Sequence, residues 1–142
     1  MTSQAAPTDS SVHVIQTTES YNELLKSHKY VAVDFHASWC GPCKAMSPLF
    51  EKFAAEHAAQ GSVAFAKVDV DEVPDVAARY RVTSIPTFMF IKDGREYEEV
   101  KSANPPKLKS AVDEMIAELS KETAGAADDK NDGAKAIQDE NW

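Results

Sequence analysis

Hydrophobic positions along the chain follow two different periods, and segments of the two kinds alternate. The nearly continuous apolar run at residues 30–35 predicts a central strand covered on both faces, because a half-exposed strand would alternate apolar and polar positions. Residues 63–70, rich in β-branched residues and alanine, predict another strand. Between these runs, the apolar side chains of residues 46–57 recur at spacings of three and four, which predicts an amphipathic helix. The core of the fold is therefore predicted to be a strand, helix, strand unit.

Shorter patterns predict the remaining elements. Thr17 or Thr18 can cap a helix that runs to about His28, and residues 92–94 (Lys-Asp-Gly) are typical of a tight hairpin turn. The other predicted elements are strands at 12–16, 87–91 and 95–100, and helices at 74–80 and from 104 or 105 to about 119. This order, βαβαβαββα, implies an α/β fold with a mixed sheet and helices on both faces.

Length and composition favour one globular domain. A chain of 142 residues with 43% hydrophobic residues can bury a core without disulfide staples. We expect a flexible segment at 1–11 and a domain at 12–119. Residues 120–142 are polar and acidic, and we expect them to form an extension that is mostly disordered.

Charge and targeting signals narrow the function classes. The net charge of −8 argues against nucleic acid as a partner. No segment is long and apolar enough to cross a membrane, and residues 1–10 contain neither an apolar run nor an arginine. We therefore expect a cytoplasmic protein with no membrane partner.

The two cysteines of the chain are three positions apart, in the run 39–44 (Trp-Cys-Gly-Pro-Cys-Lys). This run follows a predicted strand and begins a predicted helix. N–H groups and the dipole at a helix N-terminus stabilise a thiolate at the first cysteine. Cys40 is therefore the candidate nucleophile, and Cys43 is the candidate resolving thiol. We expect Cys40 to be the more exposed and the more acidic of the two.

Three other interpretations of the pair are weaker. A structural zinc ion needs four ligands, and His13, His28, His36 and His57 are not in an H-x3-5-H arrangement, so we expect no metal. In papain-type proteases an aromatic residue follows the nucleophilic cysteine, whereas here it precedes the pair. A purely structural disulfide would close a loop too short to constrain the unfolded chain much.

Four motifs in the same order and spacing resemble the thioredoxin family. They are D-F-x-A-x-W-C-G-P-C-K at 34–44, K-V-D-V-D at 67–71, I-P-T-F at 85–88 and K-D-G at 92–94. The resemblance covers about residues 12–119 and looks closest to eukaryotic cytosolic members, with a fungal character at 103–105. It implies the thioredoxin fold, which has a mixed five-stranded sheet flanked by four helices.

The resemblance implies a protein disulfide reductase. Cys40 would attack a target disulfide, and Cys43 would then resolve the mixed disulfide. Gly41 and Pro42 between the cysteines are typical of a reductant. The redox-active disulfide would need no cofactor, since reducing equivalents would come from NADPH through thioredoxin reductase. Targets such as peroxiredoxins, methionine sulfoxide reductases or ribonucleotide reductase would be partners.

Asp34 is an acid within an apolar strand, and burial should raise its pKa. By resemblance, this carboxyl group lies behind Cys43, and Lys67 lies on the neighbouring strand. The implied role of Asp34 is proton acceptor for Cys43, directly or through a water molecule. A solvated acid at a strand end is the alternative.

The resemblance also implies a cis bond between Ile85 and Pro86 and an apolar surface on which targets dock. That surface would comprise Trp39, Gly41, Pro42, Ser84, Ile85 and Pro86. At its edge, Lys101 and Ser102 replace a common apolar residue and glycine, which puts target preference in doubt. His36 also departs from the family pattern, and we interpret it as a packed or hydrogen-bonded side chain.

Two other function classes remain. One is an isomerase or oxidase domain, which the Gly-Pro dipeptide and the absence of a secretory signal disfavour. The other is a binding module whose fold serves a partner complex without using the thiols. Reduction of insulin in the presence of a reductase separates the disulfide reductase from these two classes.

Overall fold

The computed structural model describes residues 11–57 and 62–131, and its elements follow the predicted order. The described residues up to Val112 belong to one compact unit, and those from Asp113 to Asn131 belong to a second. The elements are β1 (Val12–Ile15), α2 (Thr18–Ser27), β2 (Tyr30–His36), α3 (Gly41–His57), β3 (Val63–Asp69), α4 (Pro74–Arg79), β4 (Thr87–Lys92), β5 (Arg95–Val100) and α5 (Pro105–Asn131).

The strands form one mixed sheet in the order β1-β3-β2-β4-β5. β3 runs parallel to both β1 and β2, whereas β4 runs antiparallel to β2 and β5. β2 is therefore the central strand, with neighbours on both edges. The mixed five-stranded sheet and the four helices confirm the predicted fold class.

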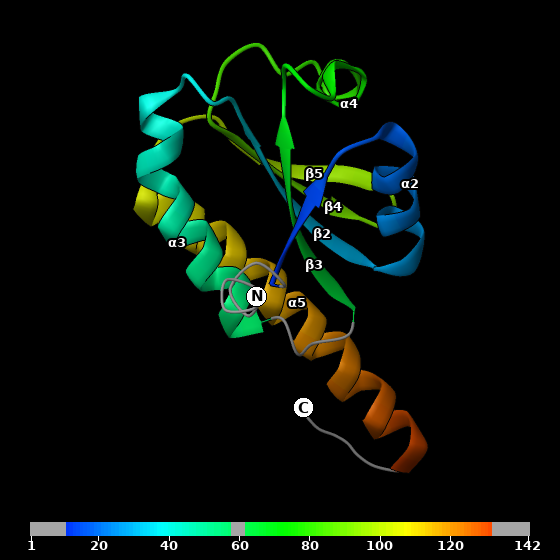
Figure 1. The fold of residues 1–142 in the computed structure, drawn as a ribbon. Helices are drawn as coiled ribbons and strands as arrows, with labels where there is room; N and C mark the ends of the chain where they lie inside the picture. Colours follow the sequence, from blue (N-terminus) through cyan, green and yellow to red (C-terminus); the bar gives the residue numbers. More distant parts are fainter. Residues whose placement is uncertain (1–10, 58–61, 132–142) are drawn as a thin grey trace, which may run out of the picture. The chain divides into compact units, whose positions relative to one another are not determined.

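The alternation of side chains along β2 separates the two layers of the core. Val33 and Phe35 belong to a cluster with side chains of α2 and α4. Ala32 and Asp34 point to the other face, because successive strand residues alternate. There Phe50 of α3 packs against Phe65 and Phe88, at ring-centroid distances of 5.5 and 5.7 Å. In Figure 1, α3 and α2 accordingly lie on opposite sides of the sheet.

The predicted helix cap and the predicted hairpin turn are both present in the structure. Thr17 caps α2, and its side chain accepts a hydrogen bond from the Ser20 N–H at 3.0 Å while the Ser20 hydroxyl reaches back. Asp93 and Gly94 both have positive φ angles, 52° and 81°, which suit the two central residues of a type I′ hairpin. The Asp93 N–H donates to the Lys29 carbonyl at 2.8 Å, so the turn is also tied to the start of β2.

The last helix is longer than predicted. α5 continues to Asn131, so the expectation of disorder is wrong for residues 120–131. Three alanines, two lysines and Glu122 in this stretch favour helix, and the single Gly125 costs only about 1 kcal/mol. Residues 132–142 lie outside the described part of the chain. None of the described helices is long and apolar enough to span a membrane.

Phe50→Ala should destabilise the fold by roughly 3–5 kcal/mol, because it removes a fully buried ring between α3 and the sheet. Urea unfolding of the oxidised protein measures the change. Leu49→Ala is the matched control, since Leu49 is the neighbouring, only half-buried residue and should cost clearly less. Equal losses for the two variants would mean that Phe50 does not anchor the helix.

Candidate active site

Cys40 and Cys43 are joined by a disulfide, with Cα atoms 5.3 Å apart. They lie at the junction between the central strand β2 and α3, which begins at Gly41. The Cys43 N–H donates to the Cys40 sulfur at 3.1 Å. The first turn of α3 thus directs a backbone donor at Cys40, and the same donor would stabilise a thiolate there.

The expected difference in exposure between the cysteines is not found. Each is only 4% exposed, because in the disulfide form both pack in one small cluster with Ala37. Val70 and Ile85 pack against this cluster from two other segments. The backbone hydrogen bond to Cys40, not exposure, is therefore what distinguishes the two sulfur atoms here.

Trp39 is the large exposed side chain beside the disulfide. It is 69% exposed, and its indole N–H donates to an Asp71 carboxylate oxygen at 2.9 Å. Asp69 in turn accepts hydrogen bonds from the backbone N–H groups of Asp71 and Glu72, at 2.8 and 3.3 Å. The loop after β3 therefore sets the orientation of the indole ring.

The other predicted docking residues differ in how far they are buried. Gly41, Pro42 and Ser84 are exposed, Ile85 is half-buried and Pro86 is buried. The Ile85–Pro86 bond is cis, as expected, and Ile85 contacts the cysteine cluster.

Lys101 and Ser102 are exposed and follow β5. Lys101 forms an ion pair at 3.9 Å with Glu99, which lies near the end of β5. The effect of Lys101 and Ser102 on target preference stays a prediction.

Asp34 is buried in the central strand with only 1% of its surface exposed, which excludes the solvated alternative. Neither of its carboxylate oxygens has a hydrogen-bond partner among the described residues. Burial raises the pKa of Asp34 to about 7, the nearby Lys67 cation opposes this, and Glu51 adds to it. The carboxyl group therefore changes protonation state near neutral pH.

Lys67 lies directly beside Asp34 in the pairing of β2 with β3, as expected. Its ammonium group is nevertheless bonded to α3. The Lys67 Nζ donates to the Ser47 hydroxyl at 2.8 Å and forms an ion pair with Glu51 at 3.4 Å. Asp34 thus feels the positive charge of Lys67 without a hydrogen bond to it.

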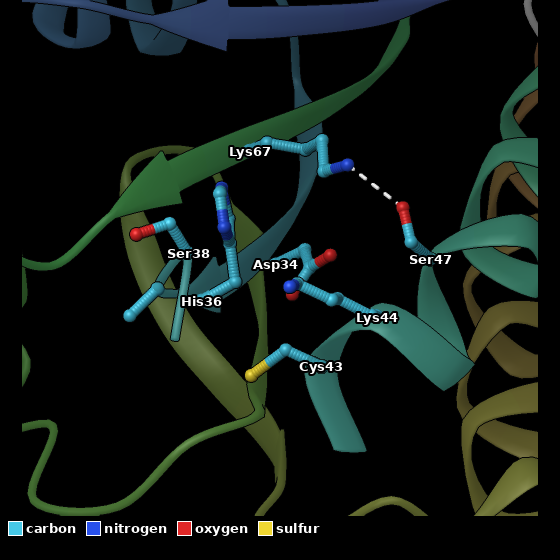
Figure 2. A pocket seen from close by; sticks show the side chains of 8 residues that line it. Asp34, His36, Ser38, Cys43, Lys44, Ser47 and Lys67 are labelled. Carbon is cyan, nitrogen blue, oxygen red and sulfur yellow. Dashed lines mark hydrogen bonds between the residues drawn. The ribbon is translucent and has the colours of Figure 1, made fainter. Parts of the chain in front are cut away.

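A cavity of about 150 Å³ connects these groups (Figure 2). Its volume exceeds what one water molecule needs, and Asp34, Ser47 and Lys67 contribute polar groups to its lining. His36 is half-buried at the rim, and burial together with Lys67 lowers its pKa, so the ring is neutral near pH 7. The lining residues are Asp34, His36, Ala37, Ser38, Cys43, Lys44, Ser47 and Lys67.

The sequence interpretation missed Ser47 and Glu51. Their spacing of four residues places both on one face of α3, and this pattern could have pointed to them once that face was known to meet Lys67. It also missed Ala37 and Val70, which pack around the disulfide but resemble ordinary core residues. No group of three or more His, Cys, Asp or Glu residues in the described chain is arranged to hold a metal ion.

A cysteine pair at the start of a helix, beside a cis-proline loop and above a buried carboxyl group, defines a thiol–disulfide oxidoreductase. Comparisons with known proteins agree. The Thioredoxin family profile matches residues 11–114. Thioredoxin-2 of Pyricularia oryzae is 48% identical over 101 residues, which are 71% of this chain and 57% of that relative. Thioredoxin of Coprinus comatus is 42% identical over 75% of this chain and 99% of its own length.

Solved structures give the same result. One neighbour, from a study of thiol resolution in yeast mitochondrial 1-Cys peroxiredoxin via glutathione and thioredoxin systems, is 35% identical with a TM-score of 0.64. The match covers 74% of this chain and 96% of the neighbour. The chain therefore belongs to the thioredoxin family, and Cys40–Cys43 is its redox-active disulfide.

Asp34→Asn should change the pH dependence of folding stability. The folded-state pKa of Asp34 is about 7 and its ordinary value is 3.8, so its neutral form stabilises the fold fully below about pH 4. This contribution is lost as pH rises through 7. Relative to the variant, the wild type should lose roughly 2–4 kcal/mol between pH 4 and pH 8.

Urea unfolding of the oxidised wild type and variant at pH 4 and pH 8 measures this change. Any effect of the introduced amide that does not depend on pH cancels when the two differences in stability are compared. Asp75→Asn is the control, because Asp75 is an exposed acid on α4. If the wild type and Asp34→Asn differ by the same amount at both pH values, the raised pKa of Asp34 is wrong.

Proposed function

We propose that this protein is a protein disulfide reductase in which Cys40 is the nucleophile, Cys43 the resolving thiol and Asp34 the proton acceptor. The observation that carries the proposal is the position of the Cys40–Cys43 pair above a buried, unpaired carboxyl group. The same cavity is lined by Asp34 and Cys43. A nucleophile, a resolving thiol and a proton acceptor are thus available within one unit of the chain.

In the first step, the Cys40 thiolate of the reduced protein attacks one sulfur atom of the target disulfide. The target S–S bond breaks, a mixed disulfide forms, and the other target sulfur leaves as a thiolate that takes up a proton. The Cys43 N–H that contacts the Cys40 sulfur favours the thiolate needed for this attack. The Cys43 thiol, in contrast to its backbone N–H, takes no part until the mixed disulfide exists.

In the second step, the Cys43 thiol loses its proton and attacks the Cys40 sulfur. The Cys40–Cys43 bond forms, and the second target sulfur leaves as a thiol after it takes up a proton. Asp34 receives the Cys43 proton, directly or through a water molecule in the shared cavity. With a pKa of about 7, a large fraction of Asp34 is ionised at neutral pH and able to accept.

Targets would dock on the exposed surface around the disulfide. Trp39 provides its largest apolar side chain, and Gly41, Pro42 and Ser84 leave the adjoining backbone accessible. An extended target segment could pair with backbone groups next to Pro86 as an added strand. Lys101, with Ser102, would favour targets that carry acidic residues near the disulfide.

We further propose that thioredoxin reductase regenerates the dithiol with electrons from NADPH, and that the protein is cytoplasmic. A peroxiredoxin is one class of target, since the yeast neighbour comes from a system that resolves peroxiredoxin thiols. Methionine sulfoxide reductases and ribonucleotide reductase are further candidates. Residues 12–119 contain every group of this mechanism, so we propose them as the catalytic domain, with segments 1–11 and 120–142 outside it.

Cys43→Ser should trap target proteins as mixed disulfides on Cys40, whereas Cys40→Ser should trap few. The reason is the order of attack, because the first variant lacks resolution and the second lacks initiation. Recovery of covalent partners on non-reducing gels, followed by their release with dithiothreitol, measures the difference. Equal trapping by both variants would overturn the assigned roles.

Asp34→Asn should slow resolution at pH 7, by up to roughly 100-fold, because the variant cannot accept the Cys43 proton. Reduction of insulin with NADPH and a thioredoxin reductase gives the overall rate. Stopped-flow tryptophan fluorescence of the reduced protein mixed with a disulfide substrate isolates the chemical steps. Asp75→Asn should retain the wild-type rate; if Asp34→Asn does too, Asp34 is not the proton acceptor. Insulin reduction that is absent even in the wild type would instead favour a binding module.

A further inference from the structure

Ser47, Glu51 and Lys67 form a closed network, and two of them, Ser47 and Lys67, line the cavity. Lys67 donates to the Ser47 hydroxyl at 2.8 Å, and that hydroxyl donates to Glu51 at 3.2 Å. The Lys67–Glu51 ion pair at 3.4 Å closes the triangle. A serine hydroxyl has one donor and two acceptor positions, so it can serve both neighbours at once.

The direction of the Lys67 side chain is unexpected for its place in the sheet. Asp34 is its partner residue on the adjacent strand, and a buried carboxylate is a strong attraction for an ammonium group. Figure 2 shows the side chain running instead to Ser47 on α3. The Lys67 side chain is only 18% exposed, so solvent screens the interactions of its ammonium group weakly.

Few other charges can compensate Asp34. On its own strand, His36 is neutral near pH 7 because its pKa is lowered. On α3, Cys43 and Lys44 line the same cavity; Cys43 is bonded in the disulfide, and Lys44 is exposed to solvent and is not among the charges that shift the pKa of Asp34. On β4, the partner residue is the apolar Phe88. The charges that act on Asp34 are therefore those of Lys67 and Glu51.

Resting on the proposed function, we propose that Ser47 and Glu51 are positioning residues that keep the Lys67 ammonium group on α3 and so leave the Asp34 carboxyl group without a direct counter-ion. They touch neither target nor sulfur. They act on the reaction through Lys67, by setting the pH at which Asp34 can accept the proton of Cys43. An ammonium group released from α3 would pair with Asp34 and favour its ionised form.

The test measures the pKa of Asp34 in the oxidised protein, from the pH titration of its side-chain carboxyl ¹³C signal. Glu51→Gln and Ser47→Ala should each lower that pKa, by roughly 1 unit or more for Glu51→Gln, because both free Lys67 to approach Asp34. Glu56→Gln is the matched control, since it removes the same charge from an exposed position of the same helix. It should leave the pKa of Asp34 nearly unchanged.

A double-mutant cycle separates positioning from the direct charge of Glu51. In a Lys67→Met background, Glu51→Gln should shift the pKa of Asp34 much less than it does in the wild type. Equal shifts in the two backgrounds would overturn the inference, because Glu51 would then act on Asp34 directly. So would a shift with Glu51→Gln and none with Ser47→Ala, since the hydroxyl would not hold the cation.

The functional readout is the pH profile of the resolution step in the reduced protein. Asp34→Asn should abolish the limb of this profile that reports the titration of Asp34. If the inference and the proposed function both hold, Glu51→Gln shifts the same limb to lower pH. A lowered pKa of Asp34 with an unchanged profile would refute the proton-acceptor role and leave the positioning intact. An unchanged pKa in Glu51→Gln, with a slow Asp34→Asn variant, would refute the positioning alone.

Discussion

The carboxyl group of Asp34 is buried on the central strand of the sheet without a hydrogen-bond partner in the described chain, and the active site is arranged around it. An ionised carboxylate in such a place is strongly disfavoured, so the group remains protonated to an unusually high pH. Its position follows from strand geometry. β2 is covered on both faces, and the period of two directs Asp34 toward the side that α3 covers.

The junction between β2 and α3 places the sulfur atoms over this carboxyl group. The strand ends at His36, the helix starts at Gly41, and the short segment between them carries the first cysteine. Because β2 has neighbours on both edges and α3 is fastened to the sheet by Phe50, neither element can shift without loss of packing. The separation between Cys43 and Asp34 is therefore set by the core, as the proposed proton transfer between them would require.

Periodicity and turn chemistry predict most of the fold, because these signals are local. The element order, the hairpin at Asp93 and the burial of Asp34 all follow from the sequence. The end of α5 does not, since a polar stretch of good helix formers resembles a solvated tail. The bonding of Lys67 to α3 does not follow either. Strand pairing brings Lys67 beside Asp34. Only the packed position of α3 decides that the Lys67 ammonium group bonds to Ser47 and Glu51 instead.

Stability and reactivity make opposite demands on Asp34. A direct ion pair with Lys67 would lower its pKa, so the carboxylate would be ionised at every physiological pH but would attract a thiol proton weakly. Complete isolation from charge would raise the pKa further and leave the group protonated, hence unable to accept. The cation held at Ser47 and Glu51 provides an intermediate field, and the pKa of about 7 lies where both protonation states are populated. Under the proposed mechanism, Asp34 would gain a proton in one half-reaction and lose it before the next, and a pKa in that range suits such a group even though its ionised form weakens the fold.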